Sequence, residues 1–128
     1  MATGALVHQA LGAAETLARR GIPVRIMDCY SIKPIDREAL RIAAGETRLL
    51  ISVEDHFAQG GLGEAVAAAV AGLAPVRIEA VRKRPHSGSG EKLLSEQGLD
   101  TGSLVELVTR LTRGEPGSAR PGQAGPPR

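Results

Sequence analysis

Apolar side chains recur with helical spacing in five stretches of this 128-residue chain and gather in three shorter stretches between them. The spacing predicts helices over residues 6–20, 36–45, 62–73 and 90–97, and a last helix from Asp100 or Thr101 that carries Leu104, Leu107, Val108 and Leu111. The short stretches, residues 23–27, 48–53 and 75–81, have the length and composition of strands. Helices that alternate with strands in this way predict an α/β fold, a three-layer α/β/α sandwich around a mostly parallel sheet.

The two later strands are expected to have different surroundings. Residues 48–53 are almost uninterruptedly aliphatic after Arg48, which favours a strand that is covered on both faces. Residues 75–81 instead alternate apolar side chains with Arg77 and Glu79, so we expect one face of this strand to meet solvent. Asp36 and Asp100 are good N-cap residues, and Gly98 marks a helix end.

Composition limits the folded part of the chain. Residues 114–128 consist almost entirely of Gly, Pro, Ser, Ala, Gln and Arg and contain no large apolar residue, so we expect a disordered tail there. One domain over residues 1–113 remains. Its core must be aliphatic, because the chain has no Trp, one Tyr and one Phe.

Charge and cysteine content narrow the range of partners. The net charge is only +2, although Arg77 and residues 82–84 form a basic cluster. No aromatic stacking platform accompanies this cluster, which favours a solvent-exposed loop over nucleic-acid binding. The single cysteine, Cys29, excludes an internal disulfide and suits a reducing compartment, and the longest apolar segment, residues 65–71, is too short to span a bilayer. We therefore expect a cytoplasmic protein that binds neither nucleic acid nor membrane.

The candidate site lies where the second predicted strand ends. The apolar run that reaches Val53 is followed by a charged triplet, a glycine-rich turn and a helix. In parallel α/β sheets, ligands and partners usually bind at this carboxyl edge. The residues selected as candidate interface or anion contacts are Glu54, Asp55, His56, Gly60, Gly61 and Gly63.

Each part of this candidate site has more than one interpretation. The glycines could present backbone amides to a phosphate, or could only allow a tight turn, which is favoured because no phosphate-binding lysine accompanies them. His56 could act in a proton relay or a metal pair, or could close the strand end with a hydrogen bond, within the chain or across subunits. Closure is favoured because no third ligand has metal spacing. No residue is assigned a catalytic, cofactor-binding or metal-binding role.

Four segments, in order along residues 2–111, resemble the C-terminal domain of transketolases. They are Thr3-Gly4-Ala5-Leu6-Val7-His8-Gln9-Ala10-Leu11; Val24-Arg25-Ile26-Met27-Asp28 with Ser31-Ile32-Lys33-Pro34-Ile35-Asp36; Glu54-Asp55-His56 with Gly60-Gly61-Leu62-Gly63-Glu64-Ala65-Val66; and Pro85-His86-Ser87-Gly88 with Leu93-Leu94 and Gly98-Leu99-Asp100. The Pro-x-Ser-Gly segment favours transketolase over related thiamine enzymes, which usually have an Asp-x-Phe-type segment there.

The resemblance implies a supporting role for this chain. In the family a first strand precedes the glycine turn, and it is expected to be missing here. Two further domains hold thiamine diphosphate and Mg²⁺ through motifs that include Gly-Asp-Gly, which this sequence lacks. The implied molecule is a C-terminal domain or subunit that binds no cofactor alone and is not catalytic alone. It completes a homodimer or hetero-oligomer with N-terminal transketolase domains.

Three functions follow from the resemblance. The favoured one is support of thiamine-diphosphate-dependent transfer of a two-carbon ketol unit between sugar phosphates. The alternatives are the same domain from a 2-oxoacid dehydrogenase beta subunit or a deoxyxylulose-phosphate synthase, and a non-catalytic interaction module of the same fold. Because the absence of the first strand would leave backbone groups of the neighbouring strand unpaired at an edge, we also expect the isolated chain to be aggregation-prone or dimeric.

Overall fold

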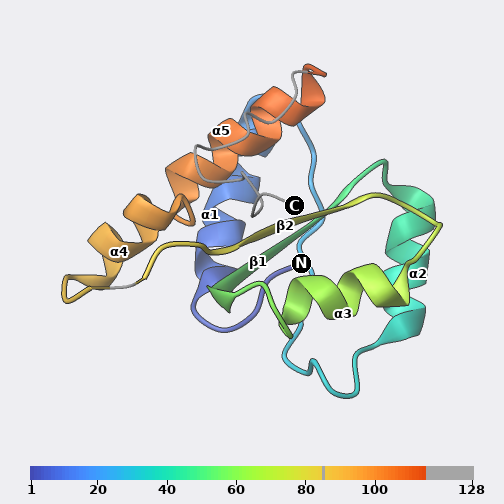
Figure 1. Ribbon diagram of the computed structural model, residues 1–128. Coiled ribbons are helices and arrows are strands. Elements are labelled where there is room, and N and C mark those ends of the chain that lie inside the picture. Colours follow the sequence, from blue (N-terminus) through green and yellow to red (C-terminus); the bar gives the residue numbers. More distant parts are fainter. Residues whose placement is uncertain (85, 115–128) are drawn as a thin grey trace, which may run out of the picture.

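Two parallel strands with helices on both faces form the centre of the molecule (Figure 1). The computed structural model describes residues 1–84 and 86–114. Its elements are α1 (Leu6–Arg19), α2 (Arg37–Glu46), β1 (Leu50–Phe57), α3 (Leu62–Ala69), β2 (Val76–Val81), α4 (Gly90–Gln97) and α5 (Thr101–Thr112). Of the predicted tail, only Gly114 belongs to the described residues. The prediction of disorder for residues 115–128 concerns residues outside the described part of the chain.

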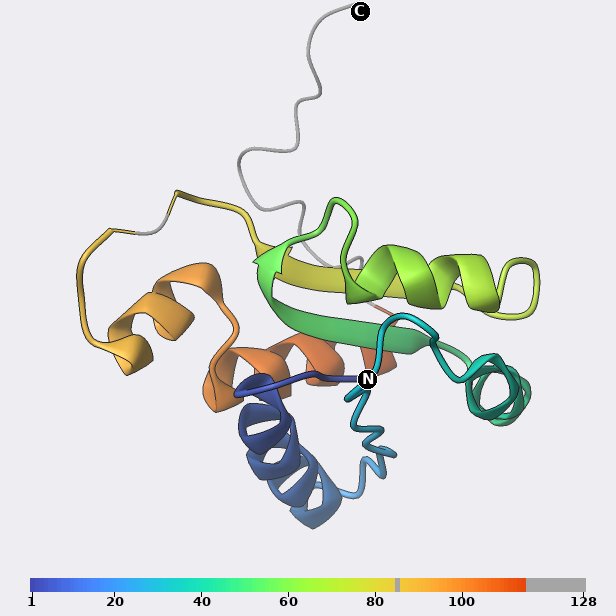
Figure 2. The ribbon, with the colours of Figure 1, turned by 90° about the horizontal axis from the view of Figure 1, so that it is seen from below.

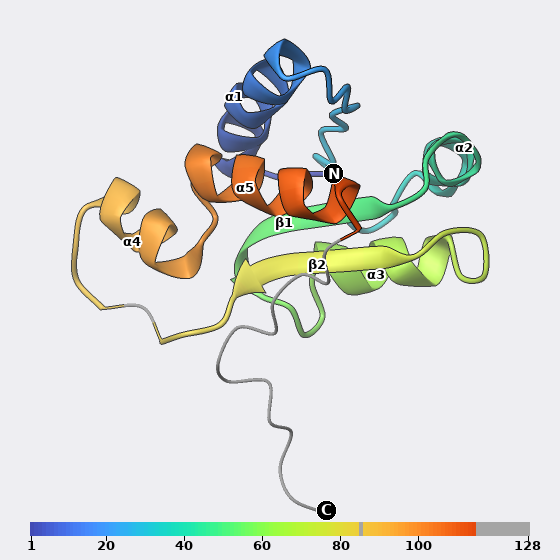
Figure 3. The same cartoon turned by 90° about the horizontal axis from the view of Figure 1, so that it is seen from above.

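The helices divide into two layers. Helices α1 and α5 lie side by side on one face of the sheet, whereas α3 covers the other face and α2 lies at its end (Figures 2 and 3). Each layer has its own apolar cluster, because successive residues of a strand point to opposite faces. Val53 of β1 packs with Leu6 and Leu17 on the α1 side, and Leu50 packs with Leu62 on the α3 side. This arrangement confirms the three-layer α/β/α fold with a parallel sheet.

The helix ends follow the capping residues that the sequence indicates. The Asp36 carboxylate accepts a hydrogen bond from the Ala39 amide at 2.9 Å, and the Asp100 carboxylate accepts one from the Ser103 amide at 3.0 Å. Gly98 ends α4 in the left-handed conformation, at φ 70°, which a residue without a Cβ adopts with little strain.

A short segment at Met1 and Ala2 runs parallel to β1 and lies beside it. Ala2 bridges both Asp28 and Val53 in parallel orientation. Its amide donates to the Met27 carbonyl at 3.0 Å, and its own carbonyl accepts from the Cys29 amide at 2.8 Å. The strand that was expected to be missing is thus represented only by the isolated bridges of Ala2, between residues 27–29 and β1.

The strand predicted over residues 23–27 does not form. The segment is extended, but of its backbone groups only the Met27 carbonyl makes a backbone hydrogen bond within the described residues. A strand is defined by pairing with a neighbour, and the neighbour here reaches only the end of the segment, at Ala2. The prediction of a strand over residues 23–27 is therefore wrong, although the composition of the segment favours one.

Two other element boundaries and one burial pattern differ from the prediction. Strand β1 continues beyond the apolar run to Phe57, through residues that we expected to form a polar tip. Helix α3 ends at Ala69 and is followed by a turn in which Gly72 has a φ of +79°, so the predicted end at residue 73 is wrong. In β2, Glu79 is buried rather than exposed to solvent, because Arg77 pairs with its carboxylate at 2.6 Å.

The cap at Asp100 gives a testable prediction for stability. Burial tends to raise the pKa of Asp100, but hydrogen bonds from Ser103 and Ser95 outweigh burial and hold the pKa below its ordinary value. We expect Asp100→Ala to lower the free energy of unfolding by about 1 kcal/mol at pH 7 because α5 loses its cap. Urea denaturation measures this change.

The matched control is Asp100→Asn, which keeps the cap and removes the charge. A carboxyl group with a lowered folded pKa adds stability above its unfolded pKa, near 3.8, and this contribution is lost as the pH falls through the folded pKa. The difference between the wild type and Asp100→Asn should therefore shrink as the pH falls below about 4. A difference independent of pH would contradict the role of the charge.

Candidate functional site

The buried Glu54 carboxylate organises the carboxyl edge of the sheet. Its side chain has no exposed surface and lies at the start of α3, where Oε2 accepts from the Leu62 amide at 2.7 Å and Oε1 from the Gly63 amide at 3.0 Å. The first amides of a helix have no partner within the helix, and its amino-terminal end is partially positive. Glu54 therefore joins the end of β1 to the start of α3.

The glycines of the turn make room for this contact. A Cβ on Gly61 would overlap the Glu54 carboxylate and the His56 ring, and a Cβ on Gly63 would lie only 2.6 Å from the Ile78 side chain. Gly60 has a φ of +72°, a backbone conformation that residues other than glycine rarely adopt. Each of the three positions thus has a steric or conformational reason to be glycine, which agrees with the interpretation of this segment as a tight turn.

The amides of the turn already have acceptors within the chain. Gly60 donates to the Glu64 carboxylate at 2.8 Å, and Gly61 donates to the Ala58 carbonyl at 3.2 Å. Leu62 and Gly63 donate to Glu54. An external anion would have to displace one of these carboxylates, so an anion contact at Gly60, Gly61 or Gly63 remains a prediction.

His56 closes the strand end on its outer side. Its Nε2 lies 3.0 Å from Oε2 of Glu54, and its Nδ1 lies 2.6 Å from the Phe57 carbonyl oxygen. Both ring nitrogens thus face oxygen atoms of the chain. Asp55, between the two, is exposed to solvent. Within residues 1–84 and 86–114, no group of three His, Cys, Asp or Glu residues is placed to hold a metal ion.

Two exposed aromatic side chains flank this site, and the sequence reasoning did not select them. Phe57 ends β1 and is 49% exposed, and Tyr30 is 91% exposed. Because Asp28 and Val53 both lie opposite Ala2, the parallel register places Tyr30 level with Asp55. The only Tyr and the only Phe of the chain therefore both lie at the carboxyl edge. The available signal in the sequence was a repeated spacing, because Tyr30 follows Asp28 by two residues and Phe57 follows Asp55 by two residues.

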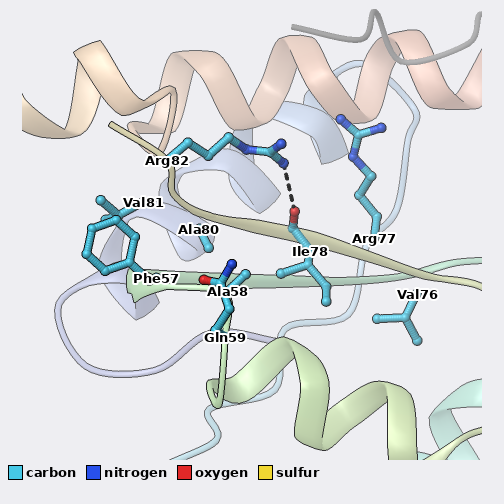
Figure 4. A pocket seen from close by; sticks show the side chains of 9 residues that line it. All are labelled: Phe57, Ala58, Gln59, Val76, Arg77, Ile78, Ala80, Val81 and Arg82. Carbon is cyan, nitrogen blue, oxygen red and sulfur yellow. Dashed lines mark hydrogen bonds between the residues drawn. The ribbon is translucent and has the colours of Figure 1, made fainter. Parts of the chain in front are cut away.

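A hollow of about 510 Å³ lies beside Phe57, along β2 (Figure 4). Figure 4 shows Arg77 and Arg82 extending from the face of β2 that points away from α3. The Arg82 guanidinium donates a hydrogen bond to the Ile78 carbonyl oxygen at 3.1 Å. The guanidinium groups of Arg77 and Arg82 lie 2.6 and 3.8 Å, respectively, from the buried Glu79 carboxylate. These two members of the predicted basic cluster are thus engaged by their own strand.

The following segment is tied to α4. The His86 ring lies 2.7 Å from the Glu96 carboxylate, and hydrogen bonds with the Ser87 carbonyl and with Glu96 raise the pKa of His86. Gln97 accepts from the amides of Arg82 and Lys83 at 3.0 and 3.2 Å. No helix among the described residues is long and apolar enough to cross a membrane.

Removal of the Glu54 carboxylate should destabilise the fold far more than removal of its exposed neighbour. Glu54→Ala leaves the amides of Leu62 and Gly63 buried without an acceptor, so we expect a loss of about 3 kcal/mol in the free energy of unfolding. Chemical denaturation followed by circular dichroism measures the loss. The matched control is Glu64→Ala, which removes an exposed carboxylate bonded to Gly60 and should cost less than about 1 kcal/mol. Equal losses in the two variants would show that Glu54 is not the anchor.

Comparison with known proteins identifies the family. The family model for the C-terminal domain of transketolase matches residues 1–104. Mouse transketolase is 40% identical over 111 residues, which are 84% of this chain and 18% of the mouse protein, and human transketolase is 38% identical over the same shares. A solved structure described as a split gene transketolase, inactive beta4 tetramer, superposes with a TM-score of 0.79 at 35% identity, covering 85% of this chain and 37% of the other. This chain thus spans less than a fifth of the length of these curated relatives. It belongs to the transketolase C-terminal domain family.

Proposed function

We propose that this chain is the C-terminal part of a transketolase-type enzyme and acts together with N-terminal transketolase domains or a separate subunit that contains them. The assembled enzyme transfers a two-carbon ketol unit between sugar phosphates. The observation that supports this is the family match over residues 1–104, from a chain that corresponds to less than a fifth of its relatives. The same relatives do not favour a 2-oxoacid dehydrogenase beta subunit or a deoxyxylulose-phosphate synthase.

The described residues do not fit thiamine diphosphate and Mg²⁺. Mg²⁺ is held by carboxylate oxygens together with the phosphates of its ligand, and among residues 1–84 and 86–114 no group of three His, Cys, Asp or Glu residues is placed to hold a metal ion. The amides at the start of α3 are engaged by Glu54. We therefore assign the cofactor to the partner domains, where it supplies the chemistry of two-carbon transfer when bound. This chain contributes shape and contact surface.

The carboxyl edge is the surface that we assign to the partner domains. Asp55 and His56 present polar groups there, and Tyr30 and Phe57 present exposed aromatic rings. Aromatic side chains are enriched at protein interfaces because they bury a large area with few rotatable bonds. Glu54, held by α3, fixes this edge from within. The assembly is a homodimer or hetero-oligomer in the cytoplasm.

The solved relative adds support for an inactive state without the partner. That protein is described as an inactive beta4 tetramer. By analogy, this chain alone is oligomeric and has no ketol-transfer activity. The exposed apolar side chains Leu11, Ile42 and Phe57 are consistent with association.

Reconstitution tests the proposed function. The chain is co-expressed with a transketolase polypeptide that contains the N-terminal domains and lacks the C-terminal domain, and the complex is purified through a tag on this chain. We expect thiamine-diphosphate-dependent ketol transfer from a ketose phosphate to an aldose phosphate by the complex, and none by either part alone. Pyruvate decarboxylation in place of ketol transfer would move the function to the 2-oxoacid class. A stable complex that adds no activity would favour an interaction module.

Substitution at the carboxyl edge tests the assigned contact surface. Tyr30→Ala with Phe57→Ser should weaken association with the N-terminal domains about tenfold or more, because exposed aromatic anchors contribute a large share of interface energy. Leu73→Ser is the matched control, since Leu73 is 57% exposed but precedes β2 at the opposite edge. Surface plasmon resonance compares the three proteins. Equal weakening by both variants, or by neither, would place the contact elsewhere.

A further inference from the structure

The outer edge of β2 is open. Strand β2 pairs with β1 on one side, and within the described residues no strand lies on its other side. The Leu50 amide donates to the Pro75 carbonyl, so this carbonyl points toward β1. The backbone groups of successive strand residues point to opposite sides of the strand, and alternate residues of β2 therefore face outward. These outward residues are Val76, Ile78 and Ala80.

The open stretch is closed at both ends. It begins after Pro75, which has no amide to donate. It ends at Arg82, whose amide donates to the Gln97 side-chain oxygen at 3.0 Å. Between these two residues, the outward groups form one hydrogen bond within the described part of the chain, from the Arg82 guanidinium to the Ile78 carbonyl oxygen at 3.1 Å. The open stretch is therefore short and centred on Ile78.

The side chains of this stretch differ between the two faces of the sheet. The Ile78 side chain lies beside Gly63 of α3, whereas Arg77 extends from the opposite face (Figure 4). Glu79 shares the face of Arg77, because the two residues are two positions apart, and the Arg77 guanidinium lies 2.6 Å from the Glu79 carboxylate. Ile78 is thus flanked by one positive and one negative side chain on the same face.

A second copy of the chain complements this edge. Two identical edges related by a two-fold axis run antiparallel, and their outward residues must face each other for backbone hydrogen bonds to form. With Ile78 opposite the Ile78 of the second copy, Val76 lies opposite Ala80, and Arg77 lies opposite Glu79. A shift by two residues places Arg77 opposite Arg77 in one direction and Glu79 opposite Glu79 in the other. Like charges directly opposite each other are destabilising, so the register about Ile78 is favoured.

We propose that two copies of this chain associate through the outer edges of β2, paired antiparallel about Ile78, so that their sheets become one. The hollow of about 510 Å³ beside β2 leaves room for the side chains of the added strand. An acidic segment of another protein would suit Arg77 but would oppose Glu79, which favours the second copy. The proposal depends on the geometry of β2 and not on ketol transfer.

Arg82 protects this edge in the single chain. Its side chain is 35% exposed, and its guanidinium occupies the Ile78 carbonyl that the amide of the second copy would reach. Charged side chains at a sheet edge commonly limit such pairing. Association therefore requires the guanidinium to leave this carbonyl, and removal of Arg82 should favour the dimer.

Sedimentation equilibrium of the full chain tests the association. Because the paired stretch is short, we expect a weak dimer with a dissociation constant of about 10–100 μM. Arg82→Ala should tighten the dimer about fivefold or more, because the Ile78 carbonyl no longer has a competing donor. The matched control Arg84→Ala removes an exposed positive charge beyond the open stretch and should leave the constant unchanged. A constant unaffected by Arg82→Ala, or monomers of both proteins at about 1 mM, would overturn the proposal.

Residue-resolved hydrogen exchange locates the contact. Exchange of the Val76, Ile78 and Ala80 amides should slow as the protein concentration rises, because these amides gain acceptors only in the dimer. The amides of Arg77 and Glu79 face β1 and should be protected equally at every concentration. Slowing at another surface, without slowing at the three outward amides, would show that the copies associate elsewhere.

A charge swap tests the register. Arg77→Glu combined with Glu79→Arg keeps the ion pair within the chain and keeps opposite charges facing each other between two swapped copies. A mixed dimer of swapped and wild-type chains would instead place like charges opposite each other. We therefore expect native mass spectrometry with isotope-labelled wild type to show mixed dimers well below their statistical share. A statistical share would contradict the register.

If the swapped chain does not fold, the exchange pattern of the wild type decides the proposal. None of these outcomes bears on the activity of the reconstituted enzyme, which is measured with a different partner.

Discussion

The contact between the buried Glu54 carboxylate and the first amides of α3 is the constraint on which the carboxyl edge depends. A carboxylate without exposed surface is stable only where protein donors replace water, and the donors here are the Leu62 and Gly63 amides and the His56 ring. These contacts fix the position of α3 relative to β1. They also explain the glycine-rich turn, because a Cβ on Gly61 would occupy the place of the carboxylate.

This constraint separates the charged triplet into inner and outer parts. Glu54 is buried, His56 packs back onto it, and Asp55 faces solvent. The edge therefore offers an outer rim of Asp55, Tyr30 and Phe57 over a rigid interior. A rim that combines exposed aromatic rings with polar groups suits another polypeptide surface better than a small anion, because the amides of residues 60–63 already have acceptors within the chain.

The sequence predicted those features that short-range chemistry determines. Asp36 and Asp100 cap helices, and Gly98 ends one, because capping depends on a few neighbouring residues. Features that depend on distant partners were not predictable. Residues 23–27 have the composition of a strand but no neighbour along most of their length, and Glu79 is buried only because Arg77 and Arg82 fold over it. Similarly, Glu54 was recognised as a candidate, but its role needed the position of α3.

Two features of this fold are incompletely covered within the described residues. The extended residues 23–27 have a backbone partner only at Met27, and the carboxyl edge has exposed aromatic rings. Extended backbone without a neighbour and exposed aromatic rings are both features that a further polypeptide segment can cover. The two regions are linked through Ala2, which pairs with both Asp28 and Val53 and leads into α1. The register that Ala2 sets between these two segments is therefore also the register that places Tyr30 level with Asp55 at the carboxyl edge.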